Sequence, residues 1–133
     1  MTQTASIRSD DVLESDGAIK LRKVILSGRL DMLGMEEIAL KLTSLTAIKP
    51  LPVILDLRDV SFLASIGIRS IISSARALDQ KGGRMVLLLG TNELVKATLE
   101  STGIDDVIPM VSDEDQAERD ALARGSIDGA TPA

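Results

Sequence analysis

The chain has 133 residues, enough for one domain of roughly 100 residues with short tails. It contains no Cys and no His, which excludes thiol chemistry, zinc sites of the Cys/His kind and imidazole bases. Its net charge is −5 and Phe62 is its one aromatic residue, so it lacks the basic face and the stacking platform that nucleic acid binding requires. No apolar run approaches the roughly 20 residues of a membrane span, and the N-terminus has no signal-peptide core. We expect a cytoplasmic protein that binds no nucleic acid and does not insert into a membrane.

The N-terminal part predicts a flexible segment followed by two paired strands. Residues 1–10 are polar and are expected to be flexible. A short edge strand is expected over 11–14, and a longer strand over 19–27, whose apolar second half indicates that it enters the sheet interior. Residues 28–31 are expected to form a loop.

Helical and extended patterns alternate through the rest of the chain. The expected elements are helices over 35–47, 65–80, 92–101 and 113–124, the last two capped by Asn92 and Ser112, strands over 53–57, 84–89 and 107–109, and a loop over 58–64. This alternation predicts a mainly parallel sheet with right-handed crossovers, and the first strands form an antiparallel edge. We therefore predict an α/β fold in which one domain over 11–124 has a mixed sheet of about five strands and about four helices. A flexible tail over 125–133 is expected to follow.

No motif in the chain predicts a catalytic site. The pair Gly82-Gly83 follows a helix, so it is a helix stop rather than a phosphate-binding loop. Asp56 is expected at the carboxyl end of a buried parallel strand, where ligands bind in open α/β sheets, and Asp31 follows the neighbouring strand. Two carboxylates without a third ligand make a weak metal site and can equally cap loops or form salt bridges. We expect no enzymatic activity, no metal and no cofactor.

Ser65 stands where a buried strand leads into a helix. As the N-cap, its hydroxyl would accept a hydrogen bond from the backbone N–H of Gly67 or Ile68, and this structural role alone would explain the residue. The same position suits phosphorylation, because free N–H groups and the positive end of the helix dipole favour a phosphate there. We expect Gly67 to leave the backbone beside the hydroxyl open to a partner. Arg69, one turn further on, could bind a phosphate or an acidic group of a partner.

Four segments of the chain carry short motifs in a characteristic order. They are Gly28-Arg29-Leu30-Asp31, the stretch from Ile54 to Leu63, Ala64-Ser65-Ile66-Gly67-Ile68, and the stretch from Gly82 to Leu87. Together they resemble the STAS domains of the anti-sigma factor antagonist, or anti-anti-sigma factor, family. The resemblance covers about residues 11–115 and implies a single STAS-type domain.

The resemblance implies a role in partner switching without catalysis. In this family the unphosphorylated antagonist binds an anti-sigma serine kinase and so releases the sigma factor. The kinase phosphorylates the antagonist with ATP, and a metal-dependent phosphatase restores it. By the resemblance Ser65 is the phosphate acceptor, Asp31 matches a residue associated with kinase contact, and Asp56 holds the strand end nearby. The expected partner-binding residues are Asp31, Asp56, Ala64, Ser65, Ile66, Gly67 and Arg69.

Two positions beside Ser65 differ from the family pattern, which usually reads Asp-Ser-Ser-Gly-Leu. Ala64 replaces the acid, and Ile66 replaces the second serine with an apolar side chain that could support a weak dimer. A second hypothesis is therefore a constitutive STAS adaptor subunit of a transport or signalling complex, never phosphorylated. A third is a small enzyme or ligand-binding protein that uses Asp31 and Asp56. We expect a monomer or a weak homodimer.

Overall fold

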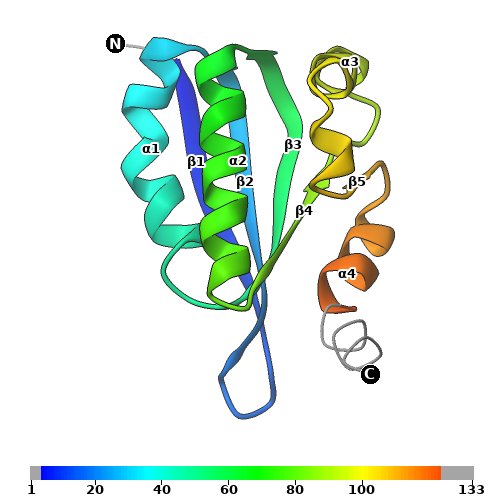
Figure 1. The fold of residues 1–133 in the computed structure, drawn as a ribbon. Coiled ribbons are helices and arrows are strands. Elements are labelled where there is room, and N and C mark those ends of the chain that lie inside the picture. The colour runs from blue at the N-terminus through cyan, green and yellow to red at the C-terminus, as the bar shows by residue number, and fades with distance from the viewer. Residues whose placement is uncertain (1–3, 124–133) are drawn as a thin grey trace.

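A computed structural model describes residues 4–123 of the chain (Figure 1). The elements are, in order, β1 (Ala5–Leu13), β2 (Ile19–Leu30), α1 (Met32–Thr46), β3 (Pro52–Leu63), α2 (Ser65–Gln80), β4 (Arg84–Leu88), α3 (Glu93–Ser101), the 3-10 helix η1 (Ile104–Asp106), β5 (Met110–Val111) and α4 (Glu114–Leu122). The five strands form one sheet in the order β1-β2-β3-β4-β5. β1 runs antiparallel to β2, and every other pair is parallel. The predicted α/β fold with a mixed, mainly parallel sheet is confirmed.

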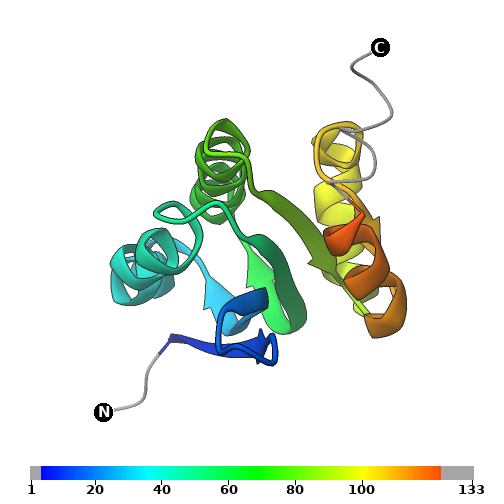
Figure 2. The same ribbon diagram turned by 90° about the horizontal axis from the view of Figure 1, so that it is seen from below.

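The two faces of the sheet are covered by different helices. Alternate residues of a strand point to opposite faces, and β3 illustrates this: Val53 and Leu55 pack in the larger core with α1, α2 and α3. Ile54 belongs to a smaller core with Ala117 and Ala121 of α4. The view along the strands shows α1 and α2 together on one side of the sheet, with α4 near its β4–β5 end (Figure 2). None of the helices in the described part of the chain is long and apolar enough to cross a membrane.

The first strands are longer than the sequence predicted. The expected flexible segment over 1–10 is wrong from Ala5 onward, where β1 begins; residues 1–3 lie outside the described part. The strand is polar because it is the sheet edge, and its inward side chains Ala5 and Ile7 still join the larger core. The expected loop over 28–31 is also wrong, because β2 continues to the fully buried Leu30.

The expected loop over 58–64 is instead the second half of β3. Up to Asp56 this strand is paired on both sides, but β4 ends there. Beyond Asp56 the pairing continues with β2 alone, through two register shifts, as far as Leu63 opposite Leu30. One-sided pairing leaves Arg58 and Asp59 exposed, which is why this part of the strand has a loop-like sequence.

The C-terminal elements are shifted by a few residues. The strand expected over 107–109 lies at Met110–Val111, after η1, because Ile104 and Ile108 turn into the larger core before the chain reaches the sheet. The cap of α4 is Asp113, not Ser112, and its carboxylate accepts from the N–H of Gln116 at 2.9 Å. The expected tail over 125–133 lies outside the described residues.

Asn92 joins α3 to the exposed half of β3. Its side-chain oxygen caps α3 by accepting from the N–H of Val95 at 3.2 Å, as the sequence predicted. Its amide nitrogen donates to the carbonyls of Leu57 at 3.0 Å and Val60 at 2.8 Å. These β3 carbonyls lie where β4 no longer pairs, so Asn92 supplies the donors that a neighbouring strand would otherwise provide.

Replacing Asn92 by Ala should therefore remove both a helix cap and a tether for β3. We expect Asn92→Ala to lower the free energy of unfolding by about 2–3 kcal/mol, measured by urea denaturation. Asn92→Ser keeps a good cap but is too short to reach β3, so it should recover about 1 kcal/mol of that loss. A loss below about 0.5 kcal/mol for the alanine variant would contradict the double role.

Candidate functional site

The ends of β2 and β3 and the first turns of α1 and α2 lie together at one edge of the domain (Figure 1). The backbone N–H of Ala64, just before α2, donates to the carbonyl of Leu30, just before α1, at 3.1 Å. This hydrogen bond brings the two sequence motifs around Asp31 and Ser65 side by side, as expected for neighbouring parallel strands.

Ser65 is the first residue of α2, not its cap. The residue with extended backbone before the helix is Ala64, with φ −90° and ψ 170°, so Ala64 occupies the N-cap position and no side chain caps the helix. The expectation that the Ser65 hydroxyl caps α2 is therefore wrong. The side chain is exposed, and its hydroxyl makes no hydrogen bond to a described residue. Helix capping therefore does not account for the serine at this position.

The backbone at the start of α2 has free donors. The first helical hydrogen bond runs from the N–H of Ile68 to the carbonyl of Ala64 at 3.1 Å. The N–H groups of Ser65, Ile66 and Gly67 precede it, so no carbonyl of the helix accepts from them. These donors and the helix dipole favour a negative charge beside Ser65.

Gly67 is buried against the end of β2. A Cβ built on this glycine would lie 2.9 Å from the carbonyl oxygen of Leu30 and 2.9 Å from Cδ1 of Leu63. The expectation that Gly67 leaves the backbone open to a partner is therefore wrong. The glycine is needed because α2 passes so close to β2, and it holds Ser65 at the domain edge.

Asp31 is the N-cap of α1 and lies beside the start of α2. Its carboxylate accepts from the N–H of Gly34 at 2.9 Å and pairs with Arg29 at 3.1 Å. The hydrogen bond from Gly34, with a further contribution from Arg29, lowers the pKa of Asp31, so it is ionised at neutral pH. The Arg29 guanidinium also lies 4.4 Å from the centre of the Phe62 ring. Asp31, Arg29 and Phe62 thus form a connected group at this edge.

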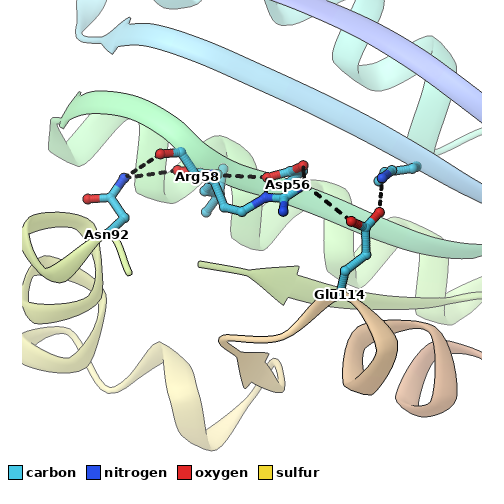
Figure 3. Close-up of polar contacts among 6 residues, drawn as sticks. Asp56, Arg58, Asn92 and Glu114 are labelled. Carbon is cyan, nitrogen blue, oxygen red and sulfur yellow. Dashed lines mark hydrogen bonds and ion pairs between the residues drawn. The ribbon is translucent and has the colours of Figure 1, made fainter. Parts of the chain in front are cut away.

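Asp56 lies away from this edge, in the middle of β3. Its side chain is 5% exposed and binds Arg58 through two contacts, of 3.0 and 2.7 Å, which raise the pKa of Arg58. Arg58 reaches Glu114 at 3.5 Å, and Glu114 also pairs with Lys23 (Figure 3). This network fastens the first turn of α4 to β2 and β3. Asp56 offers almost no surface to a partner, and the structure does not bring it together with Ser65.

The carboxylates of Asp31 and Asp56 have separate structural partners. Within residues 4–123 no group of three or more His, Cys, Asp or Glu side chains is arranged to hold a metal ion. The observed geometry gives no support to a ligand site built on this pair.

Large exposed apolar side chains on the elements that meet at this edge were missed by the sequence analysis. Met32 and Leu33 in the first turn of α1 are 66% and 58% exposed, and Phe62 at the end of β3 is 38% exposed. Ile66 beside Ser65 is half-buried, so its apolar surface is partly accessible. The sequence did carry a signal for them: Met32 and Leu33 directly follow the capping Asp31 and come before the buried residues of α1, so they lie in the exposed first turn. We call Met32, Leu33, Phe62, Ser65 and Ile66 the Ser65 surface.

Exposed apolar groups clustered around polar ones are typical of protein-binding surfaces. Of the residues expected to bind a partner, the structure places Asp31, Ala64, Ser65, Ile66 and Arg69 at or beside the Ser65 surface. Gly67 is buried beneath the same edge, and Asp56 is buried in the middle of β3, away from it. Arg69 is exposed one turn below Ser65 on α2.

A family model for the STAS domain matches residues 12–117 of the 133-residue chain. The chain therefore belongs to the STAS domain family. No curated protein sequence matches it significantly.

Solved structures with the same fold include proteins of different kinds. An anti-sigma factor antagonist from Mycobacterium paratuberculosis is 20% identical, with a TM-score of 0.71 over 87% of this chain and 94% of that one. The anti-sigma factor antagonist SpoIIAA in its unphosphorylated form is 21% identical, with a TM-score of 0.66 over 90% of this chain and 97% of that one. The murine anion transporter Slc26a9 is 16% identical, with a TM-score of 0.69 over 92% of this chain but only 23% of that one.

The burial of Gly67 gives a test of how α2 is positioned. Gly67→Ala should lower the free energy of unfolding by about 1–3 kcal/mol, because the new methyl group must displace the end of β2 or the helix. Ser73→Ala, on the exposed side of the same helix, should change it by less than about 0.5 kcal/mol. Urea denaturation measures both, and equal stabilities for the two variants would show that α2 does not pack this closely.

Proposed function

We propose that this chain is a cytoplasmic anti-sigma factor antagonist that works by partner switching. In its unphosphorylated form it binds an anti-sigma serine kinase through the Ser65 surface, and phosphorylation at Ser65 releases it. The observation that carries the proposal is the exposed, unbonded hydroxyl of Ser65 at the first position of α2, within the Ala64–Ile68 motif. A structural serine at a helix start would instead use its hydroxyl as a cap.

The position of Ser65 suits phosphoryl transfer from a kinase-bound ATP. The hydroxyl oxygen would attack the γ-phosphorus, ADP would leave, and the hydroxyl proton would pass to a base of the kinase. The product would gain a charge of about −1.5 to −2 beside the free N–H groups of α2, which favour it. The helix would therefore keep its fold while its surface changes.

The chemistry of the Ser65 surface explains why a phosphate would release the partner. A bound partner would cover apolar side chains and exclude water from them, namely Met32, Leu33, Phe62 and Ile66. A phosphate in such an interface would have to lose its hydration, which disfavours the complex. Ala64 leaves the unphosphorylated Ala64–Ile68 motif without an acid, so phosphorylation introduces the first negative charge within it. SpoIIAA, which shares the fold, has been solved in unphosphorylated and phosphorylated forms.

A second candidate is a constitutive STAS adaptor subunit of a transport or signalling complex. The partly accessible Ile66 favours it, because an apolar residue in place of a serine strengthens a permanent interface. Both candidates use the Ser65 surface to bind a partner. They differ in whether Ser65 accepts a phosphate, and in whether a metal-dependent serine phosphatase acts on the product.

Phosphate mapping separates the two candidates. The protein is incubated with each anti-sigma kinase of its source organism and magnesium ATP, and the products are analysed by mass spectrometry. We expect one phosphate, at Ser65, and none on Ser65→Ala. The exposed Ser61 and Ser73 serve as internal controls for non-specific transfer. The proposal fails if kinases that are active on their own antagonists leave Ser65 unmodified, and the adaptor then becomes the better account.

A further inference from the structure

A groove of about 580 Å³ runs between α1 and α2, which lie side by side on the same face of the sheet (Figure 1). Its α1 wall consists mainly of small side chains one turn apart, namely Ala39, Thr43 and Ala47. Its α2 wall extends from Ile66 to Ala77, a length of roughly 16 Å or three helical turns. The groove thus begins at the Ser65 surface, with Ile66 belonging to both.

The floor of the groove carries a hydroxyl that has no hydrogen-bond partner among the described residues. Ser74 lines the groove and is only 7% exposed, yet its side chain makes no hydrogen bond to a described residue. Among the described residues, every side-chain oxygen that is completely shut off from solvent has a partner, so the Ser74 oxygen must open onto the groove. A polar group of a molecule bound in the groove could replace water as the hydrogen-bond partner of this hydroxyl.

Two arginines lie along the outer side of α2. Arg69 lines the groove, and Arg76 lies seven residues, or two turns, further along the helix, where it lines a separate cavity with Asp79. Both are exposed, and neither forms an ion pair with any residue between 4 and 123. Among the described residues, none that lines the groove is acidic. The complementary ligand therefore carries negative charge on one edge and small or apolar groups toward the floor.

We propose that this groove binds an α-helix of the anti-sigma kinase whose polar edge carries carboxylates two turns apart. This inference rests on the proposed function, since it assigns a second contact to the same partner. A helix fits because small side chains let another helix approach two parallel ones closely, over a length of about three turns. The carboxylates bind Arg69 and Arg76, and a polar group near the middle of the helix bonds to Ser74.

The dipoles of α1 and α2 set the direction of the bound helix. Both helices begin at the Ser65 edge, so their positive ends and Arg69 lie together there. The bound helix runs antiparallel to them, with its negative C-terminal end near Arg69. Arg69 is also one turn from Ser65, within reach of a phosphate on that serine. Phosphorylation would then draw Arg69 away from the kinase carboxylate and weaken the groove contact.

The test measures the affinity of unphosphorylated protein for the kinase that modifies Ser65, with magnesium ADP present so that no phosphate is transferred. Charge reversal in the double variant R69E/R76E should weaken binding by about tenfold or more. The control K20E/K41E makes the same change in net charge at exposed residues outside the groove, and should stay within about twofold of wild type. Ser73→Leu fills the groove and should also weaken binding, whereas Ser73→Ala should not.

Hydrogen exchange on the kinase should show one protected helix with carboxylates two turns apart, and this protection should be lost with R69E/R76E. If wild type binds the kinase and both groove variants bind equally well, the groove assignment is wrong while the proposed function stands. If wild type neither binds nor accepts phosphate, both fail. A second copy of this chain is the alternative occupant, and sedimentation of the protein alone tests it. A wild-type dimer that Ser73→Leu dissociates would show that a second copy occupies the groove.

Discussion

The geometry of the site depends on one close contact, between the end of β2 and the start of α2. The N–H of Ala64 donates to the carbonyl of Leu30, and the absence of a side chain at Gly67 lets the helix rest against the same carbonyl. Because Ala64 is held in extended conformation by this contact, the helix begins at the next residue. Ser65 is therefore placed at the first helical position, with its hydroxyl directed to neither a cap nor the core.

The same contact sets the surroundings of Ser65. It joins the end of β2 to α2, so the capping Asp31 and the exposed Met32 lie beside the serine. The ion-pair network of Asp56, Arg58 and Glu114 has a different purpose, since it holds α4 on the opposite face of the sheet. The domain thus separates a stabilising polar cluster at the first turn of α4 from an accessible edge whose apolar and charged groups remain available to a partner.

Periodicity and capping patterns predicted much of this fold. They gave α2 with its observed bounds, the Asn92 cap of α3 and the mainly parallel sheet, because those signals are local and strong. They failed for the second half of β3, where pairing with β2 alone permits a polar sequence that reads as a loop. They also failed for β1, whose edge position lets it be polar. Such errors arise because the neighbours of a strand are decided by tertiary structure.

The candidate site was predicted in part for similar reasons. The serine was found from its place between strand and helix, but its cap role was assigned wrongly because the one-residue shift depends on the contact with Leu30. Gly67 was interpreted as an opening, whereas only the packed structure shows what a Cβ would meet. The α1–α2 groove joins residues about 30 positions apart in sequence, so no local pattern could reveal it.

The central claim is that a phosphate on Ser65 changes binding without changing the fold. The most direct measurement is isothermal titration calorimetry of the kinase with the unphosphorylated protein and with protein carrying phosphoserine at Ser65. We expect the phosphorylated form to bind about 100-fold more weakly, a difference of about 2.7 kcal/mol, while circular dichroism shows unchanged helix content. Equal affinities for the two forms would contradict it.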